Sequence, residues 1–322
     1  MLTEESNVRK QPLVIIAGPT ATGKSALSVE IAKAVGVEII SADSIQVYKY
    51  MDIGSAKITL KEMQGIPHYL VDEIDPTVEY NVMEFAKRAK AYVGRIADNH
   101  HLPIVCGGTG FYIQALLYDV EFTEEEDDGQ IRKELESLLL KPNGEEILFN
   151  RLREADPEYA DMIPKQNHKR IIRALEYYSL TGKPFSQHNA EQRIRPSAYD
   201  ALFYVLTDDR SKMYDRIDRR VDNMIRQGLV EEVKGLLDRG YSEDLVSMQG
   251  LGYKEIVSYL HGEYTLEEAV DIIKRDTRHF AKRQLTWFRR EKEVIWLDIS
   301  QCSHENIVSR ILEDIDNRFG RK

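Results

Sequence analysis

A phosphate-binding loop between a predicted strand and a predicted helix is the feature that most constrains this fold. Residues 18–25 read GPTATGKS and match the pattern G-x-x-x-x-G-K-[S/T]. An apolar run at residues 13–17 precedes the loop, and a helical pattern at residues 25–35 follows it. Backbone N–H groups of such a loop and the positive end of the helix bind phosphate oxygens. The motif predicts a P-loop-type parallel sheet that binds a di- or triphosphate with Mg²⁺.

The loop supplies the candidate diphosphate ligands. Lys24 carries a full positive charge, and the Ser25 hydroxyl is the candidate Mg²⁺ ligand. The candidate diphosphate-binding residues are Gly18, Thr20, Ala21, Thr22, Gly23, Lys24 and Ser25. An enzyme that hydrolyses nucleotides also needs an acid at the end of a neighbouring apolar strand. The apolar run at residues 103–106 continues into glycines instead, so the loop alone does not predict hydrolysis.

Strand and helix patterns alternate along much of the chain. Further strands are predicted at residues 37–40, 69–71, 103–106, 201–206 and 293–297. Further helices are predicted at residues 82–99, with Asn81 as the N-cap, and at 111–117, 211–227, 229–239 and 266–289. This alternation is typical of an α/β fold in which helices flank a parallel sheet.

One long segment departs from that alternation. An acidic run at residues 121–128 is followed by Leu-rich helical sequence without strand patterns. We therefore predict a P-loop catalytic core at residues 1–121 and 196–322, interrupted by a mostly helical insertion domain at residues 122–195.

Composition excludes several classes of protein. The chain of 322 residues has two cysteines, which cannot form a disulfide framework and which favour a reducing, cytoplasmic setting. No apolar run reaches the ~18 residues of a membrane span, so no membrane partner is expected. The net charge of −10 argues against nucleic-acid binding by the whole surface. Residues 274–292 nevertheless contain eight basic and two acidic residues, a pattern typical of a local nucleic-acid contact or of a solvated helix face.

Two strand ends carry further candidates. Asp43 follows the strand at residues 37–40, where it would face the phosphate-loop ligand as a general base or would only cap the next segment. The Gln46 amide has the donor and acceptor that recognition of a base requires. Thr109 lies in the glycine-rich turn at residues 107–110, which either approaches a ligand closely or is a tight turn with nothing bound.

These motifs together resemble the tRNA dimethylallyltransferase family, also called tRNA isopentenyltransferases, in its bacterial type. The matching stretches are residues 18–25, 41–57, 66–68, 107–112, 170–176, 250–254 and 281–289. The block DSIQVYKYMDIGSAK at residues 43–57 is far more specific than the phosphate loop. Ser55 stands where the family usually has Thr, and Phe111 where it usually has Leu. The chain ends without the zinc finger that eukaryotic relatives often carry, which favours the bacterial type.

The resemblance implies a reaction. A dimethylallyl group moves from dimethylallyl diphosphate to N6 of adenosine 37 in tRNA, and diphosphate is released. Asp43 is similar in place to the family's general base, and Thr109 would bind near the reacting centre. Arg220 best matches the arginine that stabilises the leaving diphosphate, with Arg216, one helical turn earlier, as the alternative. Mg²⁺ on Ser25 is the expected cofactor.

The resemblance also implies a partner, the anticodon stem-loop of tRNA, bound by a monomer. The residues that would contact tRNA are Asp43, Ser44, Ile45, Gln46, Thr109, Lys169, Arg170, Arg173, Gln249, Gly252, Tyr253, Lys254, Lys282, Arg283, Gln284, Trp287 and Arg289. Arg and Lys would bind phosphates, whereas Trp287, Phe288 or Tyr253 would stack on a base. At their helical spacing, Trp287 and Phe288 are also typical of core residues.

Three other functions remain open. An adenylate isopentenyltransferase would use free AMP or ATP as acceptor and would not need the insertion. A P-loop kinase of small metabolites would bind ATP tightly. A non-catalytic RNA-binding module would leave Lys24 and Asp43 unexplained.

Overall fold

The protein consists of two compact units. The computed structural model describes residues 10–120 and 129–320. The core unit comprises Met1–Asp119 and Ser197–Lys322, and the insertion unit comprises Val120–Pro196. These limits lie within two residues of the predicted ones. The predicted acidic run at residues 121–128 lies outside the described residues.

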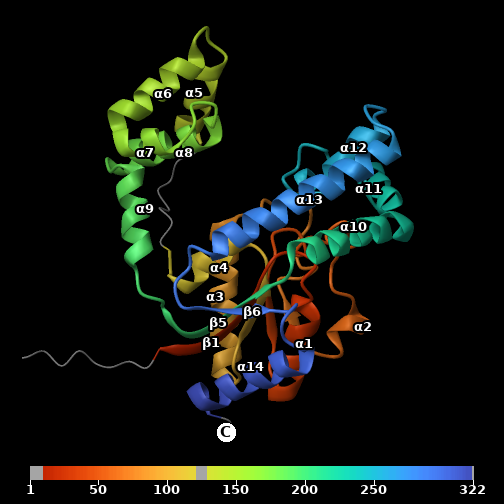
Figure 1. Ribbon diagram of the computed structural model, residues 1–322. Coiled ribbons are helices and arrows are strands. Elements are labelled where there is room, and N and C mark those ends of the chain that lie inside the picture. The colour runs from red at the N-terminus through yellow and green to blue at the C-terminus, as the bar shows by residue number, and fades with distance from the viewer. Residues whose placement is uncertain (1–9, 121–128, 321–322) are drawn as a thin grey trace, which may run out of the picture. The chain divides into compact units, whose positions relative to one another are not determined.

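A six-stranded parallel sheet forms the centre of the core unit, and Figure 1 labels its strands β1, β5 and β6. The strand order is β3-β2-β4-β1-β5-β6. Its strands are β1 (Gln11–Ala17), β2 (Ile39–Ala42), β3 (His68–Tyr69), β4 (Ile104–Gly107), β5 (Tyr199–Thr207) and β6 (Val294–Asp298). The predicted α/β class with a parallel sheet is confirmed. The second strand begins two residues later than predicted, at Ile39, so it runs up to Ala42, directly before Asp43.

The sheet is buried on both faces because side chains alternate along each strand. In β1, Leu13, Ile15 and Ala17 belong to one hydrophobic cluster, and Val14 and Ile16 belong to a second. All five side chains are completely buried. This explains why the strand appears in the sequence as an uninterrupted apolar run.

Helices cover both faces of the sheet. They are α1 (Lys24–Val35), α2 (Leu60–Met63), α3 (Val82–Asp98), α4 (Gly110–Leu117), α10 (Arg210–Gln227), α11 (Leu229–Asp238), α12 (Tyr253–Leu260), α13 (Leu266–Phe288) and α14 (His304–Phe319). Helices α1 and α14 pack on the Val14 face, whereas α3, α4, α11 and α12 supply residues to the cluster on the Leu13 face. Helices α2, α12 and α14 were not predicted. The Asn81 side chain caps α3 as predicted, since it accepts hydrogen bonds from the N–H groups of Met83 and Glu84.

The insertion unit has a hydrophobic core of its own. Its helices are α5 (Gln130–Leu139), α6 (Gly144–Ala155), α7 (Pro157–Met162), α8 (His168–Thr181) and α9 (Phe185–Ile194), and no strand occurs in its described part. Buried leucines and isoleucines of α5, α6 and α8 form the core. Asp156 is also buried, and its carboxylate accepts hydrogen bonds from the N–H groups of Tyr159 and Ser186. This one carboxylate therefore fixes the starts of α7 and α9.

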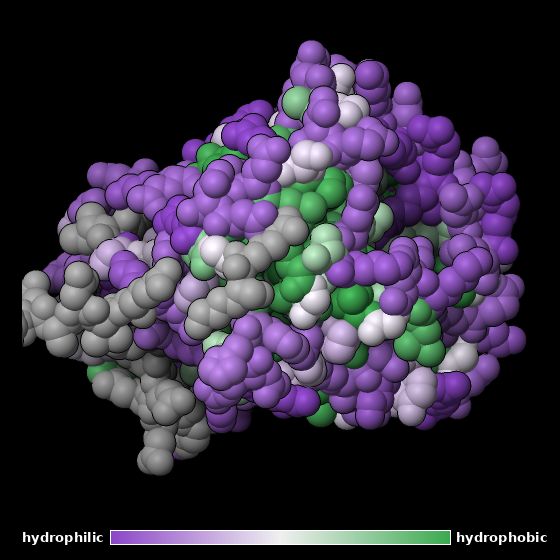
Figure 2. Space-filling view, turned by 90° about the horizontal axis from the view of Figure 1, so that it is seen from below, coloured by the Kyte–Doolittle hydropathy of each residue, from purple (hydrophilic) through white to green (hydrophobic). Residues whose placement is uncertain are grey.

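The molecular surface is largely hydrophilic on the face that Figure 2 shows. Hydrophobic residues gather there in patches between broad hydrophilic areas. Among the described residues, no helix combines the length and the apolar character that crossing a membrane requires.

Candidate functional site

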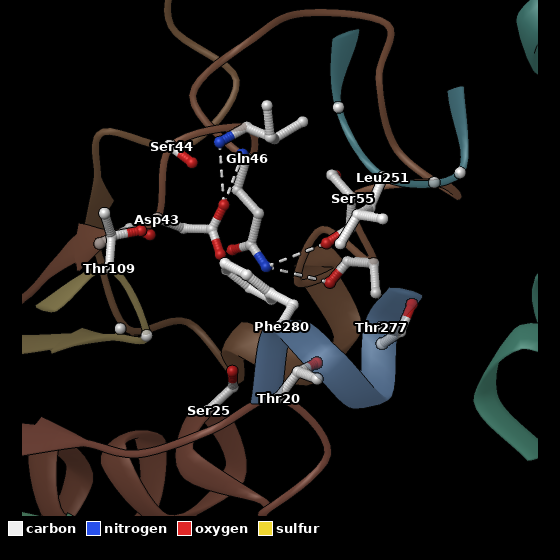
Figure 3. Close-up of a pocket in the computed structure, with 18 of the residues that line it drawn as sticks. Thr20, Ser25, Asp43, Ser44, Gln46, Ser55, Thr109, Leu251, Thr277 and Phe280 are labelled. Carbon is white, nitrogen blue, oxygen red and sulfur yellow. Dashed lines mark hydrogen bonds between the residues drawn. The ribbon is translucent and has the colours of Figure 1, made fainter. Parts of the chain in front are cut away.

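A cavity of about 650 Å³ lies at the carboxyl ends of β1, β2 and β4, where open parallel sheets bind their ligands. Three loops line it: the phosphate loop after β1, the segment from Asp43 to Gln46 after β2, and the glycine-rich turn after β4. Helices α10 and α13 close other sides with Arg220 and with residues from Asp276 to Gln284. Figure 3 shows Asp43, Ser25 and Thr109 around one space.

The phosphate loop is held by contacts within the fold. Gly18 has φ +149°, and a Cβ at this position would lie 2.8 Å from the Leu206 carbonyl oxygen of β5, so only glycine fits. The Thr22 hydroxyl donates to the Pro19 carbonyl at 2.8 Å, and Lys24 Nζ donates to the same oxygen at 2.9 Å. Of the predicted diphosphate ligands, Thr20, Lys24 and Ser25 line the main cavity. Gly18, Ala21, Thr22 and Gly23 shape the loop and do not line that cavity.

Two buried cations, Lys24 and Arg220, lie near the Asp43 carboxylate in the cavity. The pKa of Lys24 is lowered to about 8, chiefly by burial and also by the nearby Arg220, against the opposing effects of Cys106 and Asp43. Burial also lowers the pKa of Arg220, against the opposing effect of Asp43 and Glu62. Desolvated cations attract an anion strongly because water does not screen them. The site is therefore built for a polyanion.

Asp43 caps the next segment and also lines the cavity. Its Oδ1 accepts hydrogen bonds from the N–H groups of Ile45 at 2.9 Å and Gln46 at 3.2 Å, so the carboxylate does cap the next segment. Within residues 10–120 and 129–320, the structure gives no hydrogen bond to Oδ2. The carboxyl group is thus oriented by one oxygen and lines the cavity (Figure 3).

Gln46 is fixed by the loop that follows it. Its Nε2 donates to the carbonyl oxygens of Ser55 at 3.3 Å and Ala56 at 3.2 Å, as the dashed lines in Figure 3 show. These bonds consume the amide donors and orient Oε1. The side chain lines the cavity beside Asp43.

Glu232 of α11 anchors that following loop, a role that the sequence did not reveal. Its carboxylate accepts the N–H groups of Asp52, Ile53 and Gly54 at 2.7–3.0 Å. The Tyr253 hydroxyl donates to the same carboxylate at 2.8 Å. Three successive N–H groups on one carboxylate form an anion-binding nest, which fixes the backbone on which Gln46 depends.

Thr109 is the N-cap residue directly before α4, and its side chain makes no capping hydrogen bond to the helix. Its N–H donates instead to the Ala42 carbonyl oxygen at 3.2 Å, which ties the turn after β4 to the end of β2. The side chain lines the cavity close to Asp43 in Figure 3. The hydroxyl is therefore available to a ligand.

The structure separates the two candidate arginines of α10. Arg216 forms an ion pair with Asp208, and its Nε donates to the Ala21 carbonyl at 2.8 Å. It supports the phosphate loop and does not line the main cavity. Arg220, one turn later, lines the cavity. The geometry favours Arg220 as the arginine that meets a bound anion.

Helix α13 contributes more of the cavity than the sequence indicated. Arg283 and Gln284 line it as predicted candidates, and Thr277 and Phe280 line it without having been predicted. The Phe280 ring points into the space between Gln46 and Thr20 in Figure 3. Positions 277, 280 and 284 share one helix face at a spacing of three and four, which is the signal that would have identified them.

The prediction that Tyr253 and Phe288 stack on a base is wrong, because both side chains are buried. Tyr253 and Phe288 are both 0 % exposed, so neither ring is accessible to a base. Tyr253 is part of the Glu232 anchor, and Phe288 packs edge-on against Phe203 with ring centroids 6.2 Å apart. Trp287 is half-buried and packs against Phe111 with centroids 5.7 Å apart. Three other predicted residues, which lie near Tyr253 in the sequence, line the cavity: Gln249, Gly252 and Lys254.

The basic run of α13 divides into two parts. Lys274 and Arg278 pair with Asp222 and Asp218 of α10, and Arg275 pairs with the adjacent Asp276. Among the described residues, no ion pair is present for Lys282, Arg283 or Arg289, which are exposed. Only this second part of the run has charge free for an anionic partner.

The basic residues of the insertion unit differ in the same way. Arg173 pairs with the buried Glu176, which Arg132 also contacts. Lys169 and Arg170 on the first turn of α8 are exposed and form no ion pair with described residues. The structure thus leaves Lys169 and Arg170 accessible and gives Arg173 a partner within the unit.

The donors around the phosphate loop are oxygen atoms, which Mg²⁺ prefers. Ser25 is exposed to the cavity that Asp43 also lines. In the part of the chain that the structure describes, no group of three or more His, Cys, Asp or Glu residues is arranged to hold a metal ion.

Comparisons with known proteins agree on one family. Residues 46–291 match the family model described as IPP transferase. A tRNA dimethylallyltransferase of Lachnoclostridium phytofermentans is 56% identical over 287 residues, which cover 89% of this chain and 91% of that protein. The crystal structure of a tRNA isopentenylpyrophosphate transferase from Bacillus halodurans is 41% identical, with a TM-score of 0.72, covering 96% of this chain and 97% of that one. A eukaryotic dimethylallyltransferase acting on tRNA is 29% identical, with a TM-score of 0.83, covering 96% of this chain and 80% of that one.

Proposed function

This chain belongs to the tRNA dimethylallyltransferase family, and we propose that it transfers a dimethylallyl group from dimethylallyl diphosphate to N6 of adenosine 37 in tRNA. The observation that carries the proposal is the cavity in which Asp43 lies with Lys24 and Arg220. A carboxylate that can take up a proton is thereby combined with two cations suited to a diphosphate. The family membership supplies the two substrates.

In the proposed reaction, the N6 lone pair forms a bond to C1 of the dimethylallyl group. The bond between C1 and the diphosphate oxygen breaks, and its electron pair leaves with the diphosphate. N6 is a weak nucleophile because its lone pair is delocalised into the adenine ring. It becomes able to react when its proton is removed as the new bond forms.

Asp43 is the group that would accept this proton. Oδ1 is occupied by the N–H groups of Ile45 and Gln46, so the orientation of the carboxylate is fixed before the substrate binds. Oδ2 remains for the N6 proton. A positioned general base contributes about 10²- to 10⁴-fold to a rate. Thr109 borders the same space and would hydrogen-bond near the reacting centre.

The departing diphosphate gains negative charge as the bond breaks. Lys24 and Arg220 would stabilise that charge from a partly desolvated position, together with the N–H groups of the phosphate loop. Ser25 would ligate Mg²⁺, and the ion would supply further positive charge to the diphosphate oxygens.

The adenosine must leave its stack to enter a cavity of this kind. Gln46, with its Oε1 oriented, and the Phe280 ring are suited to the edge and the face of a base. The exposed unpaired cations of α13 and of α8 would bind tRNA phosphates. Unpaired basic side chains on a chain with net charge −10 would make that affinity strongly dependent on salt.

The decisive experiment offers three acceptors in parallel. Purified protein, Mg²⁺ and labelled dimethylallyl diphosphate are incubated with unmodified tRNA, with an anticodon stem-loop and with AMP. We expect label at N6 of adenosine 37 in the two RNAs and none on AMP. Label on AMP alone would identify a free-nucleotide enzyme and would reject the proposed acceptor.

A further inference from the structure

The Gln284 side chain connects two loops that are far apart in the sequence. Its Oε1 accepts the N–H of Thr20 in the phosphate loop at 3.0 Å. Its Nε2 donates to the carbonyl oxygen of Gly108 in the turn after β4 at 2.9 Å. One amide thus joins the loop that would hold the diphosphate to the turn that carries Thr109.

The surrounding structure leaves little freedom to this amide. Gln284 is only 7% exposed, and its helix is fixed by Ala281 and Phe288, both completely buried on the same face. A Cβ at position 108 would lie 2.2 Å from Gln284 Nε2, so the bridge requires glycine there. The orientation of the amide is also determined, because a flipped amide would direct its NH₂ group at the Thr20 N–H.

We propose that Gln284 is a positioning residue for the diphosphate half of the reaction and not a contact for tRNA, an inference that rests on the proposed function. The Thr20 N–H is occupied by the glutamine, so the diphosphate would be bound by later N–H groups of the loop. The bridge sets the separation between those groups and Thr109. Its effect reaches the substrates only through the two loops.

A nearby side chain provides a matched comparison. Lys282 is exposed, has no ion pair among the described residues and does not line the cavity, whereas Gln284 points into the bridge. Two residues of one helix, two positions apart, therefore predict opposite outcomes. A change at position 282 should affect tRNA binding, and a change at position 284 should affect diphosphate binding.

The first test is Gln284→Met, which keeps the length of the side chain and removes both hydrogen bonds. The full-length protein is titrated with inorganic diphosphate and Mg²⁺ by calorimetry, and with tRNA by filter binding. We expect diphosphate affinity to fall about 10- to 100-fold, roughly the size of two hydrogen bonds. The KM for dimethylallyl diphosphate should rise in parallel, with tRNA affinity within about twofold of the wild type. Lys282→Ala should give the reverse pattern.

The second test is Gln284→Glu. A protonated carboxyl group reproduces the acceptor for Thr20 and the donor for Gly108, whereas a carboxylate opposes the Gly108 carbonyl oxygen and the bound anion. Diphosphate affinity relative to the wild type at the same pH should therefore rise as pH falls from 8.5 to 6. A residue that only fills space would give a flat ratio. If Gln284→Met does not fold, this variant still tests whether Gln284 positions the loops that bind the diphosphate.

The inference is overturned if Gln284→Met weakens tRNA binding and leaves diphosphate binding unchanged, or if both affinities stay at wild-type values. Failure of the proposed function would be recognised by a different result from failure of this inference. The wild-type protein would then transfer no label to RNA, while the diphosphate titrations of the two variants would still measure the bridge.

Discussion

At the scale of single residues, Asp43 shows how one carboxylate can serve structure and chemistry together. Oδ1 accepts two backbone N–H groups, and Oδ2 is left for the substrate. Asp43→Asn keeps the acceptor oxygen and removes the basic one. We expect kcat to fall about 10²- to 10⁴-fold with tRNA affinity unchanged, measured by label transfer and filter binding.

Asp43→Ala is the control for the structural role, because it removes both oxygens. It should abolish turnover as well and should in addition loosen the segment that carries Gln46. If Asp43→Asn retained full turnover, the general base would have to be another group. Loss of tRNA binding in Asp43→Ala, together with full turnover in Asp43→Asn, would assign Asp43 to the cap alone.

The pKa of Lys24 predicts a pH dependence at the same scale. Burial lowers this pKa to about 8, so the side chain is charged below that pH and loses its charge above it. Affinity for inorganic diphosphate should thus decline as pH rises through about 8, as calorimetry at several pH values would measure. The contribution of Lys24 to the free energy of unfolding changes with pH in the opposite direction. It rises between about pH 8 and the ordinary pKa of 10.5, where the unfolded chain binds more protons.

Lys24→Arg separates this effect from other titrations. Arginine stays charged throughout the range, so the decline near pH 8 should disappear even if the affinity itself is lower. A decline that persists in this variant would assign the pH dependence to another group.

At the scale of elements, α13 has two functions along its length. Its first part pairs with α10 through Lys274 and Arg278, and its last part presents unpaired cations. Arg283→Ala should weaken tRNA binding and reduce the slope of log affinity against log salt by about one. Filter binding at four salt concentrations would measure both quantities.

Arg278→Ala is the matched control, since it removes a cation from the same helix that is already neutralised by Asp218. Its salt slope should equal that of the wild type, and the melting temperature should fall slightly, by the small contribution of a partly exposed ion pair. Equal slopes for the two variants would show that the charge of the whole helix acts on tRNA without regard to pairing.

At the scale of the whole molecule, the cavity belongs entirely to the core unit. The chain leaves the core unit and returns to it at adjacent points, because the Ala198 N–H donates to the Leu117 carbonyl oxygen at 2.8 Å. Replacing Val120–Pro196 by a short Gly/Ser linker should leave diphosphate affinity within about twofold of the wild type. The affinity for tRNA should fall roughly tenfold or more with the loss of Lys169 and Arg170.

The melting curve of this shortened protein is its control. Because each unit has its own hydrophobic core, the core unit should still unfold in one cooperative transition. Unchanged tRNA affinity in a folded shortened protein would remove the insertion unit from the RNA interface.

The sequence by itself determined the phosphate loop and the parallel α/β class, and it indicated a helical segment between the fourth and fifth strands. These are local properties, set by glycine spacing, apolar runs and turn residues within a few positions of one another. The order of the residues also indicated that Asp43 and Thr109 follow strands, and parallel strands necessarily end at one edge of the sheet. The resemblance to a known family then supplied the roles that spacing could not.

Only the tertiary structure decided between residues whose local patterns are alike. Arg216 and Arg220 lie one turn apart, and an ion pair with Asp208 withdraws the first from the cavity. Gln284 lies in a basic segment, yet its amide is bonded to loops more than 170 positions away in the sequence. Tyr253 is an aromatic residue in a glycine-rich motif, and it is buried with its hydroxyl bonded to Glu232 of α11. Contacts between distant segments depend on how the helices pack, so the pattern of residues within one segment does not predict them.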